Sequence, residues 1–194
     1  EHGMLYPSGH LIRYYDFETD QSYVLCDKAN CSHANEQCGA WYDELNKPRG
    51  LAIYKNKCYM FRYNYENNTL DFISMDLTGN NQKVLAQSDM GAIGGDGGWE
   101  LTSVGDIYYV KDTVWFFTDY NYYTEEDSAA YKRVYQGIRL SDGSPVAIDV
   151  PDSAPDSEAL FLEAVTENYL IFSQQCHEIP LLTADEFAVE CEKG

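Results

Sequence analysis

Apolar and polar residues alternate in short runs along the chain, and polar turns separate these runs. Residues 15–25 and 75–85 align without a gap: each has an apolar residue, an Asp, an apolar residue, a polar turn and a closing Val-Leu. Residues 138–148 form a third copy of the same length that lacks the Asp. Period-two alternation broken by turns is typical of β-hairpins, so this pattern predicts paired strands.

A second repeated unit precedes two of these copies. Residues 54–61 match residues 110–117, and residues 165–172 are a weaker match to both. Each copy reads as a strand, a polar turn of two or three residues and an aromatic strand. The expected strands lie near 51–54, 58–63, 70–76 and 82–86 in one set, and near 101–104, 107–110, 113–119, 131–140 and 145–150 in the next.

The recurrence predicts an all-β fold made of β-propeller blades, each with four antiparallel strands. Blade-like repeats fall at about 11–38, 51–86, 100–150 and 160–173 within a single domain or fragment spanning residues 1–194. Closed propellers have about four to eight blades, so we expect an incomplete arc of a larger propeller. The alternative is a β-sandwich whose hairpins are similar by chance. A capping box over residues 183–186 predicts a short C-terminal helix at 184–193.

The charge of the chain narrows the range of partners. The formal net charge is −19 with an isoelectric point near 4.3, and there is no basic run. Phosphate backbones and anionic lipid surfaces would repel such a chain, which argues against nucleic acid as a partner. No stretch reaches the roughly 18 apolar residues of a membrane span, so we expect no direct membrane insertion of this chain.

Three cysteines and one histidine form the most informative cluster. Cys26, Cys31, His33 and Cys38 fall within 13 residues, in the spacing Cys-x4-Cys-x-His-x4-Cys. Three thiolates and an imidazole are a complete tetrahedral ligand set for a structural Zn²⁺ ion. The alternatives are a disulfide from Cys26 or Cys31 to Cys38, with His33 exposed, or free thiols. Cys58 lies in an expected strand and is predicted to be buried and inert.

The 17 tyrosines raise the question of ligand binding. Tyr120, Tyr122 and Tyr123, flanked by Asp119 and Asn121, are the best candidate patch for a glycan or peptide, although packing between blades also explains such rings. The acidic residues, Asp119 among them, are predicted to form a solvated face. No catalytic motif is present, and we assign no catalytic residue.

A family resemblance rests on the stretch from Tyr14 to Cys38, which includes the first repeat and the Cys/His cluster, together with residues 51–63 and 70–85. This pattern resembles uncharacterised secreted β-propeller lipoproteins of clostridia-like gut bacteria, which are similar to TolB-type propellers. The resemblance implies a bacterial protein that is extracellular or attached to the cell surface, with a full-length chain about twice this size. It brings no established activity or site residues.

These observations favour a non-catalytic, extracytoplasmic β-propeller module that binds an unknown glycan, peptide or protein. Two alternatives stay open. The chain could be part of a surface hydrolase that acts on glycans or peptides, or a purely structural module that the Cys/His cluster holds together.

Overall fold

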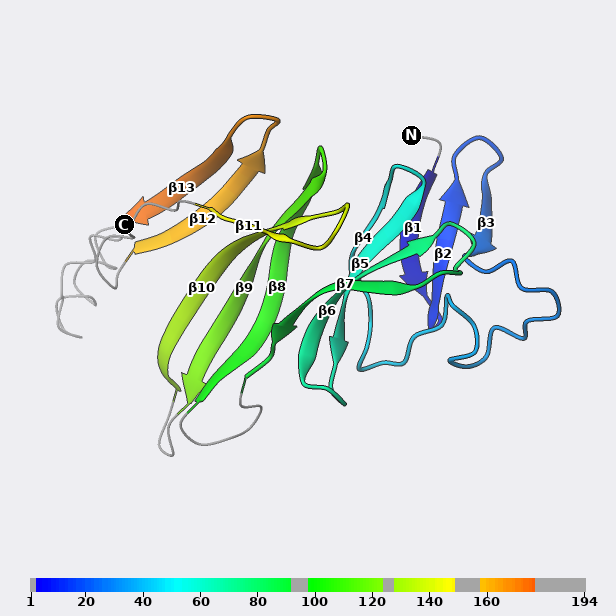
Figure 1. The fold of residues 1–194 in the computed structure, drawn as a ribbon, viewed down its shortest axis with the longest axis horizontal. Helices are drawn as coiled ribbons and strands as arrows, with labels where there is room; N and C mark the ends of the chain where they lie inside the picture. Colours follow the sequence, from blue (N-terminus) through cyan, green and yellow to red (C-terminus); the bar gives the residue numbers. More distant parts are fainter. Residues whose placement is uncertain (1–2, 92–97, 124–127, 149–157, 177–194) are drawn as a thin grey trace, which may run out of the picture. The chain divides into compact units, whose positions relative to one another are not determined.

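All regular elements of the described chain are β-strands (Figure 1). The computed structural model describes residues 3–91, 98–123, 128–148 and 158–176. Every strand pair in these ranges is antiparallel. The predicted all-β class is therefore confirmed, whereas the helix predicted at 184–193 lies outside the described residues. The chain divides into two compact units, residues 1–148 and 149–194.

The first unit begins with a three-stranded sheet in the order β1-β2-β3. Its strands are β1 (Gly3–Ser8), β2 (Leu11–Asp16) and β3 (Gln21–Val24). The predicted hairpin near 11–25 is confirmed, but β1 was not predicted. This strand lies outside the repeat and contains Pro7, a residue that edge strands tolerate because one side of the strand has no partner.

The second sheet has four strands in sequence order and matches the prediction closely. Its strands are β4 (Arg49–Tyr54), β5 (Lys57–Asn64), β6 (Thr69–Asp76) and β7 (Lys83–Asp89).

The third sheet also has four strands, in the order β11-β10-β9-β8, but it corrects one prediction. The two strands expected at 101–104 and 107–110 are a single long strand, β8 (Gly98–Val110). Gly105-Asp106 has the composition of a turn, yet these residues form a β-bulge within the strand. The register against β9 shifts between Gly105 and Tyr108, and Asp106 has a φ of 46°. The other strands are β9 (Thr113–Tyr123), β10 (Ser128–Arg139) and β11 (Pro145–Val146).

Both faces of the second sheet are buried in apolar cores. Side chains alternate between the two faces of a strand, so neighbours on β5 enter different cores. Cys58 and Met60 pack with Ile12 and Leu25 near the first sheet. The opposite face packs on the third sheet through Tyr59, Phe61, Leu70, Phe72, Val114 and Phe116.

The second unit contains one described hairpin, β12 (Glu158–Val165) and β13 (Leu170–Cys176). The hairpin predicted near 160–173 is therefore confirmed. In the part of the chain that the structure describes, no helix has the length and apolar character needed to span a bilayer.

Candidate metal centre

The four predicted ligand residues converge in the segment between β3 and β4. The ligand atoms of Cys26, Cys31, His33 and Cys38 all lie within 4.8 Å of one another. His33 Nδ1 is 3.3 Å from the Cys38 Sγ. The prediction that these residues form one cluster is confirmed, and they lie close enough to bind a metal ion.

Tight turns make this convergence possible over so short a stretch. Asn30 and His33 adopt left-handed backbone conformations, with φ of 59° and 52°. Asn and His enter this region more readily than most residues with a side chain. The Cys31 amide donates a hydrogen bond to the Lys28 carbonyl at 3.2 Å, which closes the turn before the second thiol. The chain therefore doubles back and presents its ligands to one point.

Contacts with the β6–β7 turn anchor the segment from outside. The Asp27 amide donates to the Thr78 carbonyl at 3.2 Å, and Asn80 Nδ2 donates to Asp27 Oδ1 at 2.7 Å. Gly79, with a φ of 74°, packs its Cα against the Leu25 carbonyl. These contacts fix the residue before Cys26 and the residue after it to the second sheet.

The cluster lies at the border of the first apolar core. Cys38 is only 3% exposed and belongs to the core itself, whereas Cys26, Cys31 and His33 are half-buried. Ala40 follows the last ligand into the core and is completely buried. The site therefore has one face in the protein interior and one face within reach of solvent.

This placement separates the acidities of two of the thiols. Burial raises the pKa of Cys38 to about 11. A backbone hydrogen bond from His33 is the main cause that lowers the pKa of Cys31, and the Cys26 and Cys38 thiols and Lys28 act in the same direction. In the metal-free chain, Cys31 is thus a more readily ionised thiol than Cys38.

The donor set fits a tetrahedral metal ion. In a tetrahedron with metal–sulfur bonds of about 2.3 Å, sulfur atoms lie about 3.8 Å apart, and the separations here need only a small contraction to reach this geometry. Cys26, Cys31, Cys38 and Cys58 are free thiols. The structure therefore contains none of the bridges to Cys38 that the spacing left open.

The tyrosine patch lies elsewhere, on the third sheet. Tyr120 and Tyr122 are half-buried residues of β9, and Tyr123 ends the same strand. Lys132 Nζ stands 5.2 Å from the Trp99 ring centroid and 5.3 Å from that of Tyr120. The Trp99 and Tyr122 ring centroids are 5.6 Å apart. Trp99 and Lys132 were not identified from the sequence, because only the strand register places them opposite these tyrosines.

Asp119 corrects the expectation of a solvated acidic face. It is only 8% exposed, and its Oδ1 accepts hydrogen bonds from Arg133 Nε at 2.7 Å and from the Tyr131 hydroxyl at 2.6 Å. Ser103 donates to Oδ2 at 2.9 Å. Burial opposes ionisation of Asp119, but these hydrogen bonds outweigh burial and lower the pKa of its carboxyl. The residue is thus the centre of an internal network.

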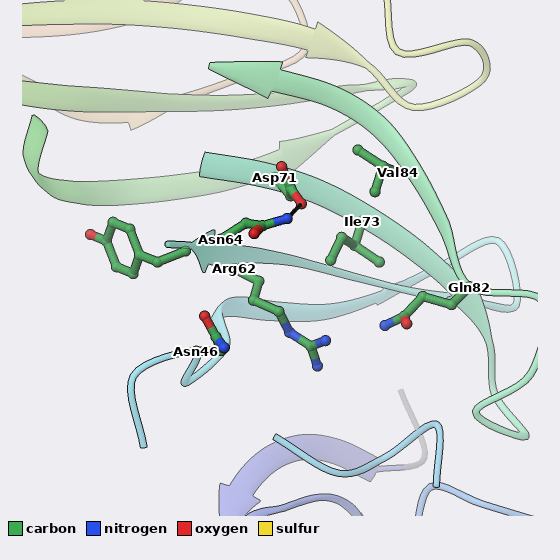
Figure 2. Close-up of a pocket in the computed structure, with 8 residues that line it drawn as sticks. Asn46, Arg62, Asn64, Asp71, Ile73, Gln82 and Val84 are labelled. Carbon is green, nitrogen blue, oxygen red and sulfur yellow. Dashed lines mark hydrogen bonds between the residues drawn. The ribbon is translucent and has the colours of Figure 1, made fainter. Parts of the chain in front are cut away.

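A polar cavity on the second sheet was also not predicted from the sequence. It is lined by Arg62 and Asn64 of β5, by Asp71 of β6 and by Asn46 from the segment before β4 (Figure 2). No local motif marks these residues, because they converge only when the segment before β4 folds over the second sheet.

Comparison of the chain with protein-family models, with curated proteins and with solved structures found no match. The resemblance to secreted propeller lipoproteins stays a prediction.

Proposed function

We propose that Cys26, Cys31, His33 and Cys38 hold one structural Zn²⁺ ion, and that the chain is a non-catalytic binding module built around it. The observation that carries the zinc assignment is the approach of four sulfur and nitrogen ligand atoms to within 4.8 Å of one another. Zinc prefers this donor set in tetrahedral geometry and contributes folding free energy when it is bound.

A structural role for the ion follows from the ligand count. Catalytic zinc sites keep one position for water or substrate, whereas four protein ligands fill the coordination sphere. The ion would hold together a segment of irregular backbone that connects β3 to β4. Because this segment also contacts the β6–β7 turn, the ion would fasten the first sheet to the second.

The wider role that we propose is an extracytoplasmic, propeller-type module for a glycan, peptide or protein ligand. Its support is a contact that recurs between successive sheets. Gly79 packs on the Leu25 carbonyl, and Gly143 packs on the Leu85 carbonyl. Leu25 and Leu85 are equivalent residues of the sequence repeat. Repeated sheets with repeated contacts between them are a property of propeller blades.

The zinc assignment is tested by titrating the metal-free, reduced chain with Zn²⁺ and following uptake by native mass spectrometry. We expect one ion per chain, with affinity reduced at least about a hundredfold by Cys31→Ser. Cys58→Ala is the matched control, because Cys58 is a free thiol outside the cluster and Ala adds no polar group to the core; it should bind zinc as the wild type does.

Two outcomes would contradict the zinc assignment. One is a wild-type chain that takes up no zinc and carries a disulfide within residues 26–38 when purified without reductant. The other is zinc uptake that Cys31→Ser leaves unchanged. The binding role is tested separately, by applying the zinc-loaded chain to arrays of oligosaccharides and of peptides; retention on neither would contradict it.

A further inference from the structure

Two of the three cluster thiols lie on the solvent side of the candidate metal centre. Cys26 and Cys31, which we call the outer thiols, are half-buried, and residues 27–30 between them are all exposed. Cys38 is only 3% exposed and packs within the first apolar core. A small oxidant dissolved in water therefore reaches the outer thiols more readily than it reaches Cys38.

The outer thiols are also close enough to become one disulfide. Every pair of ligand atoms in the cluster, the two outer sulfurs included, lies within 4.8 Å. A disulfide has a sulfur–sulfur distance of about 2.05 Å, so the sulfurs need to approach by at most about 3 Å. This movement falls on the exposed residues 27–30, whose side chains belong to neither apolar core. The bridge therefore forms without repacking the interior.

Cys38, in contrast, is held in place by its backbone. Its amide donates a hydrogen bond to the Asn35 carbonyl at 3.0 Å, and its carbonyl accepts one from the Trp41 amide at 3.0 Å. Ala40, two residues later, is completely buried. A bridge to Cys38 would pull on this buried backbone, whereas a bridge between the outer thiols leaves it undisturbed. The geometry thus favours one of the three pairings that three thiols allow.

A disulfide between the outer thiols removes two of the four zinc ligands, because zinc binds the thiolate form of cysteine. The donors that remain are His33 and Cys38, whose Nδ1 and Sγ atoms are 3.3 Å apart. Structural zinc sites have four protein ligands, and two do not retain the ion. Oxidation of the outer thiols and zinc binding therefore exclude each other.

We propose that the cluster is a redox-sensitive metal site, in which a hydroperoxide oxidises Cys26 and Cys31 to one disulfide and the zinc ion is released. The proposal rests on the zinc binding proposed above and adds its regulation. The observations that carry it are the partial exposure of the outer thiols, the short distance between them and the burial of Cys38.

The oxidation takes place in two steps. One outer thiolate attacks the O–O bond of the peroxide and becomes a sulfenic acid, while the second peroxide oxygen takes up a proton from solvent and leaves as water or an alcohol. The other outer thiolate then attacks the sulfenic sulfur, the S–S bond forms, and the sulfenic hydroxyl takes up a second proton and leaves as water. Two electrons pass from the sulfur pair to the peroxide, and Zn²⁺ departs with its charge unchanged. A thiol or phosphine reductant returns the two electrons and restores the ligands.

Release of the ion would weaken the connection between the first and second sheets. The segment between β3 and β4 contains the cluster and contacts the β6–β7 turn through Asp27 (Figure 1). With zinc bound, four ligands hold this segment together, and after oxidation only the bridge between residues 26 and 31 does. We therefore expect the oxidised, zinc-free chain to unfold at a lower temperature than the zinc-loaded chain.

The test begins with the reduced full chain, which is loaded with Zn²⁺ and freed of unbound metal. Hydrogen peroxide is then added, and bound zinc is followed over time by native mass spectrometry. We expect the ion to be lost, and zinc binding to return when a phosphine reductant and fresh Zn²⁺ are supplied.

Peptide mapping under denaturing conditions identifies the thiols that pair. Cleavage after Lys28 and after Glu36 puts each of the three cluster thiols on its own peptide. We expect the peptides of Cys26 and Cys31 to be linked and the peptide of Cys38 to carry a free thiol.

Two variants separate the disulfide from the metal site. Cys26→His and Cys31→His each replace one outer thiol by an imidazole, which zinc also accepts, and each removes one half of the bridge. Both should bind zinc and release it to peroxide at least about tenfold more slowly than the wild type does. Cys58→Ala is the control, because Cys58 is a buried thiol outside the cluster, and it should release zinc at the wild-type rate.

The results that would overturn this proposal are distinct from those that bear on zinc binding. A reduced chain that takes up no zinc would refute the zinc assignment, and the redox role would fall with it. A zinc-loaded chain that keeps its ion in peroxide, a bridge that maps to Cys38, or zinc loss that the reductant does not reverse would each refute the redox role and leave the zinc assignment intact. Release from both histidine variants at the wild-type rate would also refute it.

Discussion

Gly79, in the turn between β6 and β7, packs its Cα directly against the carbonyl oxygen of Leu25, the residue before the first cluster thiol. A methyl group at residue 79 would lie well inside van der Waals contact with that oxygen. Gly143 makes the same contact with Leu85 one repeat later. The spacing between successive sheets is thus set by two backbone contacts that only glycine permits.

Gly79→Ala should destabilise the first unit more than a left-handed glycine alone would explain. The positive φ of 74° costs alanine about 1–2 kcal/mol, and the clash with Leu25 adds to this cost. Gly9→Ala is the matched control, since Gly9 has a φ of 56° but no atom within 4 Å of the position that a Cβ would occupy. Denaturant unfolding should show a loss of about 1 kcal/mol for Gly9→Ala and about 3 kcal/mol or more for Gly79→Ala. Equal losses of unfolding free energy in the two variants would mean that the contact between Gly79 and Leu25 does not hold the first and second sheets together.

Asp119→Asn should weaken the third sheet through Arg133. Removing one partner of a largely buried charge pair leaves the other uncompensated and costs about 3 kcal/mol. Asp112→Asn is the control. Asp112 lies 3.8 Å from Lys55 in a more exposed pair, whose loss should cost less than about 1 kcal/mol. Similar unfolding free energies for the two variants would contradict a special role for Asp119.

The same substitution should change the response of stability to acid. The pKa of Asp119 in the folded chain lies below the value of about 3.9 for an unfolded Asp. Its ionised form therefore stabilises the fold above about pH 4, and this contribution is lost as the pH falls through the folded-state pKa. Unfolding measured between about pH 5 and pH 2 should show a flatter pH dependence for Asp119→Asn than for Asp112→Asn. Parallel curves would be the contrary result.

Cys58 should resist alkylation in the folded chain. The residue has no exposed surface, and burial raises its thiol pKa to about 12. Because the thiolate is the reactive species, iodoacetamide at pH 8 should modify Cys31 of the metal-free chain and leave Cys58 intact until denaturant is added. Peptide mass mapping distinguishes the two positions. Labelling of Cys58 at the rate of Cys31 under native conditions would contradict its burial.

Lys132 should couple energetically to Trp99. Its ammonium lies over two rings, whereas Lys55 lies over the Tyr54 ring alone, at 5.2 Å. A double-mutant cycle with Lys132→Met and Trp99→Leu should give a coupling free energy of about 0.5–1 kcal/mol. The corresponding cycle for Lys55 and Tyr54 should give less. A Lys132 coupling indistinguishable from zero would show that the ammonium stays hydrated and contributes nothing.

The strand pattern was predictable where local alternation and turn chemistry agree. All four strands of the second sheet, β4 to β7, follow from the repeat, because period-two alternation specifies both the strand and its faces. The prediction failed at Gly105-Asp106, where a bulge and a turn have the same composition. Only the long pairing of β8 with β9 decides between them. It failed also at β1, whose pairing with β2 has no counterpart in the repeat.

The candidate sites differ in the same way: a site built from one short segment was predictable, and sites built from distant segments were not. The Cys/His cluster was visible because its four ligands fall within a short segment, so tight turns alone can bring them together. Asp119 was misread, since its partner Arg133 is 14 residues away and reaches it only through strand register. The polar cavity left no signal at all, because Asn46 and Arg62 belong to different segments and nothing in their spacing relates them.

The sequence by itself determined the all-β class, the hairpins and the Cys/His cluster, because each depends on interactions between residues close together in the chain. Only the tertiary structure decided which faces are buried and where Asp119 lies. It alone showed that Arg62 and Asn46, from different segments, line one polar cavity. The physical reason is that burial and hydrogen-bond satisfaction depend on which distant segments pack together, and local periodicity does not encode that choice.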